Sequence, residues 1–138
     1  MSRRKAREYA LMFLYQLEIR GGEAREPREL FLEEYSLEGD GLAYFDDLCQ
    51  GVLEDREGLD KVYEPFLKGW SVDRLPKIDV VLLRIAVYEI AKTRDIPKKV
   101  AINEAVILAK KYGTDESKAY INGILGKIPE SPKNESNI

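Results

Sequence analysis

The segment from Pro76 to Lys92 is apolar on every side of a helix rather than on one face alone. Its apolar residues are Ile78, Val80, Val81, Leu82, Leu83, Ile85, Ala86, Val87, Ile90 and Ala91. A helix that is apolar all round has to be covered on every side, so it lies at the centre of its domain. The segment therefore predicts a central helix with several other helices packed around it.

Five further segments repeat their apolar residues every three or four positions, which is the period of an amphipathic helix. Glycine, proline and threonine mark where these helices begin or end. The first helix stops at Gly21-Gly22, and the second opens at Pro27 and closes at Gly39-Asp40-Gly41. The third runs from about Leu42 to about Tyr63, and the central helix is the fourth. The fifth runs from about Lys98 to Tyr112, and the sixth follows its cap, Thr114. Val62 and Val100 are among the residues expected to face inward. Six helices and no convincing strand predict an all-α domain.

The chain has 138 residues, of which 44% are hydrophobic, and a chain of this size can bury one core. We therefore predict a single domain over residues 1–128. Residues 129–138 lack the apolar side chains that would dock them, so they predict a disordered C-terminal tail. The sequence has no signal peptide and no apolar run of membrane-spanning length, which favours a cytoplasmic protein without a membrane segment.

The composition argues against catalysis. The chain contains no histidine, so it lacks the usual general base near neutral pH and the commonest metal ligand. Cys49 is the single cysteine, which excludes a disulfide within the chain and a cysteine pair for zinc or redox chemistry, and we interpret it as a packed thiol. Glycine-rich phosphate loops and nucleophile elbows are also missing from the sequence. We expect no enzyme, no metal and no cofactor.

Four of the first seven residues are basic, namely Arg3, Arg4, Lys5 and Arg7, in a chain whose net charge is −3. Subtracting these four positive charges leaves −7 for the rest of the chain. At the start of a helix such cations face the positive end of the macrodipole, where each costs up to about 1 kcal/mol, so helix formation gives no reason for them. The cluster predicts a polyanionic partner, and arginine suits RNA because guanidinium groups bind phosphate bidentately and stack on unpaired bases. A solubilising N-terminal tail is the alternative.

Three residues do not fit their predicted helices. Arg84 and Glu89 interrupt the central helix, where an unpaired buried charge costs several kcal/mol, so both need partners. For Arg84 we favour an internal ion pair, for instance with Glu104, whereas Glu89 could pair internally or with a partner protein. Gly123 lies inside the last helix at a cost of about 1 kcal/mol relative to alanine, which indicates close approach by another helix or by a ligand.

An ordered series of short motifs runs through the chain. The motifs are Arg3-Arg4-Lys5-Ala6-Arg7-Glu8, Leu14-Tyr15-Gln16, Gly69-Trp70-Ser71, Leu83-Arg84-Ile85-Ala86-Val87-Tyr88-Glu89, Ile96-Pro97, Val100-Ala101-Ile102-Asn103-Glu104-Ala105, Leu108-Ala109-Lys110-Lys111-Tyr112-Gly113 and Asn122-Gly123-Ile124-Leu125. In this order they resemble the NusB transcription antitermination factors, and the resemblance covers residues 3 to about 128. It is weakest between Glu23 and Gly41.

The resemblance implies six to seven helices in two perpendicular three-helix bundles, and no catalysis. NusB-like proteins bind the single-stranded boxA element of nascent ribosomal RNA jointly with the ribosomal protein NusE. The pair then joins RNA polymerase and other Nus factors and suppresses termination. By position, the resemblance implies RNA contacts at Arg3, Arg4, Lys5, Arg7, Glu116, Lys118 and Tyr120, and NusE contacts at Tyr15 and Glu89. For Tyr120, plain core packing is the alternative to stacking on a base.

Two other functions stay open. The chain could be an RNA-targeting helical subunit that acts with a ribosomal RNA methyltransferase, because the same helical domain precedes some of these enzymes. It could also be a helical protein-interaction module whose basic cluster is incidental. The residues leave open whether the free protein is a monomer or a homodimer.

Overall fold

The structure, a computed structural model, describes residues 2–20, 27–69, 71–93 and 95–130. These residues form seven α-helices and two short 3-10 helices, and the described part contains no strand. The α-helices are α1 (Ser2–Ile19), α2 (Pro27–Glu34), α3 (Gly39–Glu54), α4 (Arg56–Tyr63), α5 (Lys77–Lys92), α6 (Lys98–Tyr112) and α7 (Ser117–Gly126), and the 3-10 helices are η1 (Glu64–Phe66) and η2 (Val72–Arg74). The predicted all-α class is confirmed. The predicted stop at Gly21-Gly22 and most of the predicted tail lie outside the described residues.

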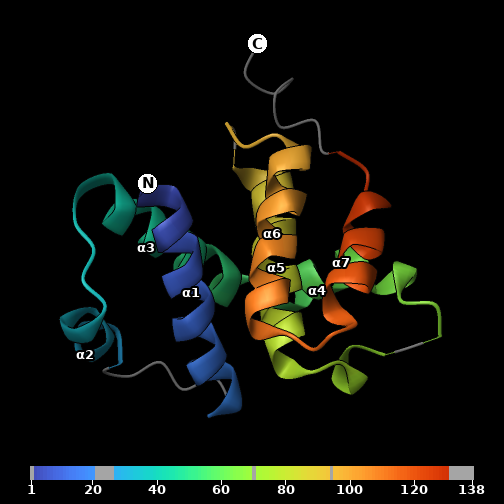
Figure 1. Cartoon of the computed structure of the whole chain (residues 1–138), viewed down its shortest axis with the longest axis horizontal. Coiled ribbons are helices and arrows are strands. Elements are labelled where there is room, and N and C mark those ends of the chain that lie inside the picture. Colours follow the sequence, from blue (N-terminus) through green and yellow to red (C-terminus); the bar gives the residue numbers. More distant parts are fainter. Residues whose placement is uncertain (1, 21–26, 70, 94, 131–138) are drawn as a thin grey trace.

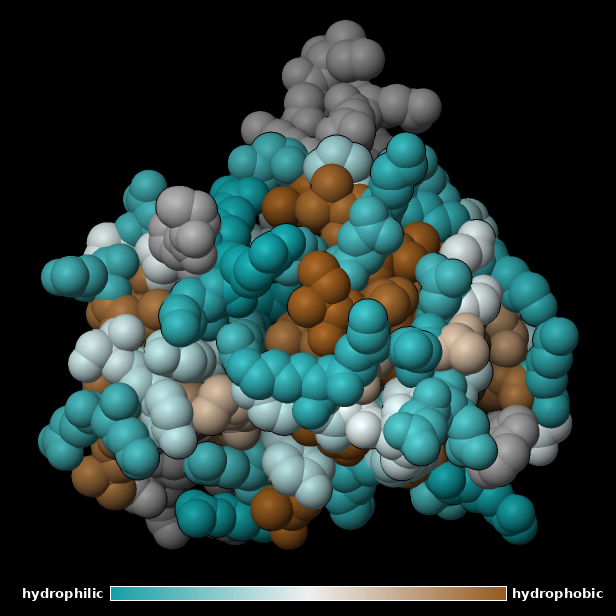
Figure 2. Space-filling view, viewed as in Figure 1, coloured by the Kyte–Doolittle hydropathy of each residue, from teal (hydrophilic) through white to brown (hydrophobic). Residues whose placement is uncertain are grey.

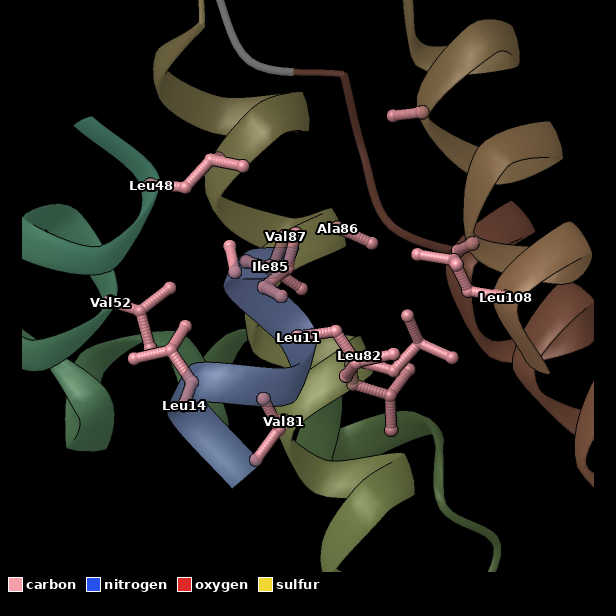
Figure 3. Close-up of a cluster of buried hydrophobic side chains, with 14 of the residues drawn as sticks. Leu11, Leu14, Leu48, Val52, Val81, Leu82, Ile85, Ala86, Val87 and Leu108 are labelled. Carbon is pink, nitrogen blue, oxygen red and sulfur yellow. The ribbon is translucent and has the colours of Figure 1, made fainter. Parts of the chain in front are cut away.

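Helix α5 is the centre of the molecule, as its all-round apolar pattern predicts. It contacts α1, α3, α4, α6 and α7, and all its residues from Asp79 to Val87 are buried. Figure 1 shows α1 to α3 gathered on one side of α5 and α7 on the other, with α6 drawn in front of α5. In the close-up of Figure 3, Val81 and Ile85 of α5 lie near Leu11 and Leu14 of α1, while Leu108 reaches in from α6.

The first group of helices is held by aromatic side chains. Phe31 of α2 lies with its ring centroid 5.4 Å from that of Phe13 of α1 and 5.9 Å from that of Phe45 of α3. Tyr9 and Tyr35 extend the same cluster toward the surface, with their ring centroids 5.3 Å apart. Large rings of this kind bury much apolar area and fix the helices in one arrangement. The short α2 is therefore packed against both of its neighbours through Phe31.

The second group pairs α6 with α7 in opposite directions. The Lys98 ammonium at the start of α6 donates to the backbone carbonyl oxygen of Gly126 at 3.1 Å, and also to that of Ile128. The last carbonyl groups of a helix have no partners within the helix, so a cation there satisfies them and suits the macrodipole. This contact fastens the end of α7 to the start of α6.

The predicted third helix over residues 42–63 is wrong as one continuous helix. It begins earlier, at Gly39, whose φ of +59° is readily adopted by glycine. It is also broken at Asp55, whose backbone is not helical and whose carboxylate accepts a hydrogen bond from the Gly58 N–H at 3.2 Å. An aspartate that caps a new helix competes with continuation of the old one. The break redirects the chain so that α4 packs along α5.

Two residues expected in the core are exposed. After the break at Asp55, helix α4 turns Leu59 and Tyr63 inward and leaves Val62 at the surface. In α6 the small residues Ala101 and Ala105 are buried, whereas Val100 is exposed. Figure 2 shows apolar atoms at the surface on the face where Figure 1 draws α6.

The predicted cap of the last helix is also wrong. Helix α7 begins at Ser117, and the side chain of its N-cap residue, Glu116, makes no capping hydrogen bond. Thr114 does not cap the helix through its side chain. The backbone N–H of Thr114 donates to the Ser117 hydroxyl oxygen at 2.9 Å instead.

Candidate nucleic-acid interface

Three of the four N-terminal cations are exposed on the first turns of α1, but each has a neighbour. Nη1 of Arg3 lies 3.0 Å from a carboxylate oxygen of Asp95. Arg4 donates to Glu104 through Nε at 3.1 Å and through Nη2 at 2.7 Å. The Lys5 ammonium lies 5.5 Å from the centre of the Tyr9 ring. The cluster is therefore a set of ordered cations set among carboxylates.

Arg7 is different because it is buried, with 3% of its surface exposed. Its guanidinium donates to both carboxylate oxygens of Glu89, at 2.7 to 3.0 Å, and to Glu104 at 3.2 Å. The Tyr44 hydroxyl donates to the same Glu89 carboxylate. The expectation that folding gives no reason for the basic cluster is therefore wrong for Arg7, which neutralises a buried carboxylate of the central helix. The signal that could have shown this is Glu89 itself, which needs a cation.

The pKa shifts of Arg7, Tyr44 and Glu104 favour the protonation states in which these side chains form the bonds of the network. Burial acts to lower the pKa of Arg7, but hydrogen bonds and proximity to Glu89 raise it above its usual range. Burial, assisted by the Glu89 carboxylate, raises the pKa of Tyr44, so its hydroxyl stays protonated and donates. The hydrogen bond from Arg4 is the main cause that lowers the pKa of Glu104. Four helices, α1, α3, α5 and α6, meet in this network.

The second predicted RNA-facing region lies at the other end of the central helix. Glu116 and Lys118 are exposed, and Tyr120 is half-buried with its hydroxyl bonded to Asp79. Asp79 and Glu89 are ten residues apart on α5, which is about 15 Å along a helix axis. The structure therefore does not bring Tyr120 into one pocket with the N-terminal cations.

Tyr120 lines a groove of about 690 Å³ between α7 and two short stretches, residues 66–68 and 74–76. Leu75 and Ile124 contribute apolar surface, and the cations of Lys68, Arg74 and Lys127 line the same groove. Gly123 lines it too, and no group of the described residues outside its own helix backbone lies within 4 Å of the position that a Cβ would take there. Within the described residues, no other helix explains this glycine, so close approach by a ligand remains the prediction.

Asp79 is a buried partner of the candidate residue Tyr120 that sequence reasoning missed. It is fully buried, and its Oδ2 accepts hydrogen bonds from the Ser117 hydroxyl at 2.9 Å and from Tyr120. Its Oδ1 has no hydrogen-bond partner among the described residues. Burial raises the pKa of its carboxyl group. The available signal was an acid in the first turn of an otherwise apolar helix, where the macrodipole favours negative charge.

The two residues implied in NusE binding are placed differently. Helices α1 and α5 pack together, as a shared surface for Tyr15 and Glu89 requires. Tyr15 is half-buried, whereas Glu89 is 1% exposed and paired with Arg7. Of the two interpretations left open for Glu89, the internal ion pair is the one that the structure contains.

Arg84 also forms the internal ion pair that we favoured, but with other partners than Glu104. It donates to both carboxylate oxygens of Asp60 at 2.9 Å and to Glu18 at 2.9 Å. Cys49 is buried, and burial raises the pKa of its thiol, as expected of a packed cysteine. Among the described residues there is no group of side chains that could hold a metal ion, and no helix is long and apolar enough to cross a membrane.

Comparisons with known proteins agree on one family. The family model described as the NusB family matches residues 4–130. The chain is similar to the transcription antitermination protein NusB of Acetivibrio thermocellus, at 45% identity over 93% of this chain and 88% of that protein. It is also similar to the protein of the same name from Trichlorobacter lovleyi, at 42% identity over 96% and 94%.

Solved structures agree with the sequence relatives. T. maritima NusB superimposes with a TM-score of 0.85 at 33% identity, over 99% of this chain and 97% of that chain. A second structure contains the antitermination factors NusB and NusE in complex with double-stranded RNA. It matches with a TM-score of 0.80 at 25% identity, over 98% and 97%.

Proposed function

The chain belongs to the NusB family, and from this premise we propose that it is a transcription antitermination factor that binds RNA together with NusE. It binds the boxA element of nascent ribosomal RNA in the cytoplasm, joins RNA polymerase and other Nus factors, and helps the polymerase to pass terminators. It acts by binding and not by catalysis. The observation that carries the proposal is the match over 98% of the chain to a NusB that was solved with NusE and RNA.

The RNA contact of this chain is centred on Arg3, Arg4 and Lys5. Their side chains are exposed on one end of α1, and cations in that position engage phosphate oxygens. Arg7 supports them from the interior through its bonds to Glu89 and Glu104. Phosphate contacts carry no sequence information, so reading of boxA requires contacts to base edges or stacking on unpaired bases. The ring of Tyr120, flanked by Glu116 and Lys118, is our candidate for such a contact.

NusE is needed because the cation cluster is small and the chain as a whole is acidic. A partner bound next to the cluster adds its own RNA contacts, and two linked weak sites bind more tightly than either one alone. We propose that NusE contacts Tyr15, and that Glu89 contributes indirectly through its buried ion pair with Arg7. Cooperative binding of NusE and RNA follows from this arrangement.

The proposal is tested by titrating single-stranded boxA RNA with and without NusE at several salt concentrations. Three engaged phosphates predict a slope of log affinity against log salt of about −2, at about 0.7 per phosphate. Replacing Arg3, Arg4 and Lys5 by alanine should flatten the slope and leave the melting temperature unchanged or higher, because these cations oppose the helix macrodipole. The matched control replaces Lys61, Lys77 and Lys110, which are exposed on other helices.

The outcomes separate the alternatives. If both triple variants bind RNA equally well, the N-terminal cluster is not the RNA site. NusE binding without any RNA binding would identify a protein-interaction module. Double-stranded RNA of the same sequence serves as the competitor. Stronger binding of the duplex would contradict single-strand recognition.

A further inference from the structure

Arg4 is held in one orientation by a chain of buried and half-buried side chains. Glu89 of α5 bonds the guanidinium of Arg7, Nη1 of Arg7 donates to Oε1 of Glu104, and the two oxygens of Glu104 accept from Nε and Nη2 of Arg4. Only 12% of the Glu104 side chain is exposed, compared with 66% of the Arg4 side chain. The chain of ion pairs therefore runs from the core outward and ends at an exposed guanidinium.

The bonds to Glu104 use one edge of the Arg4 guanidinium and leave another edge open. Among the described residues, nothing accepts a hydrogen bond from Nη1 of Arg4. The pair of nitrogens at the tip of a guanidinium matches two oxygens of one phosphate, and a lysine cannot make this planar contact. Phosphate would not displace Glu104, because the buried Arg7 also needs that carboxylate.

We propose that Glu104 is a positioning residue for RNA, which fixes the Arg4 guanidinium so that its open edge receives a backbone phosphate. This inference rests on the proposed RNA-binding function and adds a residue to it. Asp95 is the natural contrast. Its pair with Arg3 is a single hydrogen bond at 3.0 Å, with 43% of the arginine and 68% of the aspartate side chain exposed, so it is an ordinary surface pair.

Removing the charge of Glu104 and removing that of Asp95 should change the RNA affinity in different ways. Glu104→Gln and Asp95→Asn each remove one negative charge beside the cation cluster. If only net charge mattered, both variants would bind RNA more tightly. Positioning predicts that Asp95→Asn binds as well as wild type or better, whereas Glu104→Gln binds more weakly, because its amide nitrogen would face the Nη2 donor of Arg4.

A double-mutant cycle with Arg4→Lys measures the positioning itself. The affinity of each NusE complex for single-stranded boxA RNA is measured in wild type, Arg4→Lys, Glu104→Gln and the double variant. In the wild-type background, Arg4→Lys should weaken RNA binding about tenfold, because a charge-assisted bidentate contact is lost. In the Glu104→Gln background the same change should cost less than about twofold, because the orientation is already lost. A purely structural role for Glu104 would leave the cost of Arg4→Lys the same in both backgrounds.

Thermal melts of each variant accompany the titrations, and Glu104→Asp, which keeps the charge but shortens the side chain, replaces Glu104→Gln if that variant does not fold. Equal losses in both backgrounds, or tighter RNA binding by Glu104→Gln, would overturn the positioning role while leaving the proposed function intact. If the wild-type complex itself does not bind the RNA, the proposed function fails and the inference fails with it.

Discussion

At the scale of single residues, the buried charges of this protein differ in how well they are paired. Glu89 faces the guanidinium of Arg7, and Arg84 faces Asp60 and Glu18. Asp79 has hydroxyl donors on Oδ2, and its Oδ1 has no hydrogen-bond partner among the described residues. Hydroxyl groups compensate a buried negative charge less fully than a cation does, so burial raises the pKa of Asp79 above its ordinary value.

This difference predicts a pH dependence that belongs to Asp79. Because burial raises its pKa in the folded state, the folded protein holds this proton to higher pH than the unfolded chain does. The contribution of Asp79 to the free energy of unfolding therefore falls as pH rises from the unfolded pKa of about 3.9 through the folded pKa. An asparagine side chain cannot titrate, so Asp79→Asn should gain stability relative to wild type as the pH rises above about 4. Urea melts at successive pH values measure the difference, with exposed Asp73→Asn as control. A difference independent of pH would contradict the assignment.

At the scale of helices, α3 and α5 approach closely where Tyr88 lies across Gly51. A Cβ at Gly51 would lie 2.2 Å from Cε1 of Tyr88, which is closer than atoms can approach. The Tyr88 hydroxyl donates to Asp47 at 2.9 Å, one helical turn before Gly51. The half-buried ring is therefore anchored at its tip and covers the bare backbone of α3. Gly51 lowers the helix propensity of α3, but its missing side chain leaves room for the Tyr88 ring of α5.

The effect of Gly51→Ala on the free energy of unfolding should therefore depend on which residue stands at position 88. In wild type, displacement of the Tyr88 ring costs about 1–3 kcal/mol, which at least cancels the gain of about 1 kcal/mol in helix propensity. In a Tyr88→Ala background the clash is absent, so Gly51→Ala should stabilise the protein by about 1 kcal/mol. Denaturant melts of the four proteins in this cycle provide the measurement. Stabilisation by Gly51→Ala in both backgrounds would show that the ring moves aside at no cost.

At the scale of the whole molecule, the network of Arg7, Glu89, Tyr44 and Glu104 joins both groups of helices. Removing one partner of a buried ion pair leaves a charge without compensation, which costs about 3–5 kcal/mol. The total stability of a domain is about 5–15 kcal/mol, so one such change removes a large part of it. We therefore expect binding of NusE and of RNA to depend on this junction, whether or not Glu89 touches either partner.

Glu89→Gln should therefore lower the free energy of unfolding by about 3–5 kcal/mol. The combined variant Arg7→Met, Glu89→Leu, Tyr44→Phe removes the buried polar groups together and should recover most of the loss, because apolar replacements of similar volume are tolerated there. Denaturant melts and co-elution with NusE are measured on both variants. If the combined variant is stable and still co-elutes with NusE, Glu89 acts through the fold. A stable Glu89→Gln that no longer co-elutes would instead place Glu89 at the NusE contact.

The sequence by itself determined most of the helices, because the period of apolar residues is a local property. It predicted the central position of α5, the extent of α6 and the family, and it singled out the basic residues of α1. Only the tertiary structure decided the pairing of charges, since Arg7 meets Glu89 across 82 positions and Glu104 across 97. The break at Asp55 also lay beyond periodicity, because both of its sides keep a helical pattern and a capping carboxylate ends the helix. Which of the basic residues face solvent was settled by partners distant in the chain, and no local pattern contains that information.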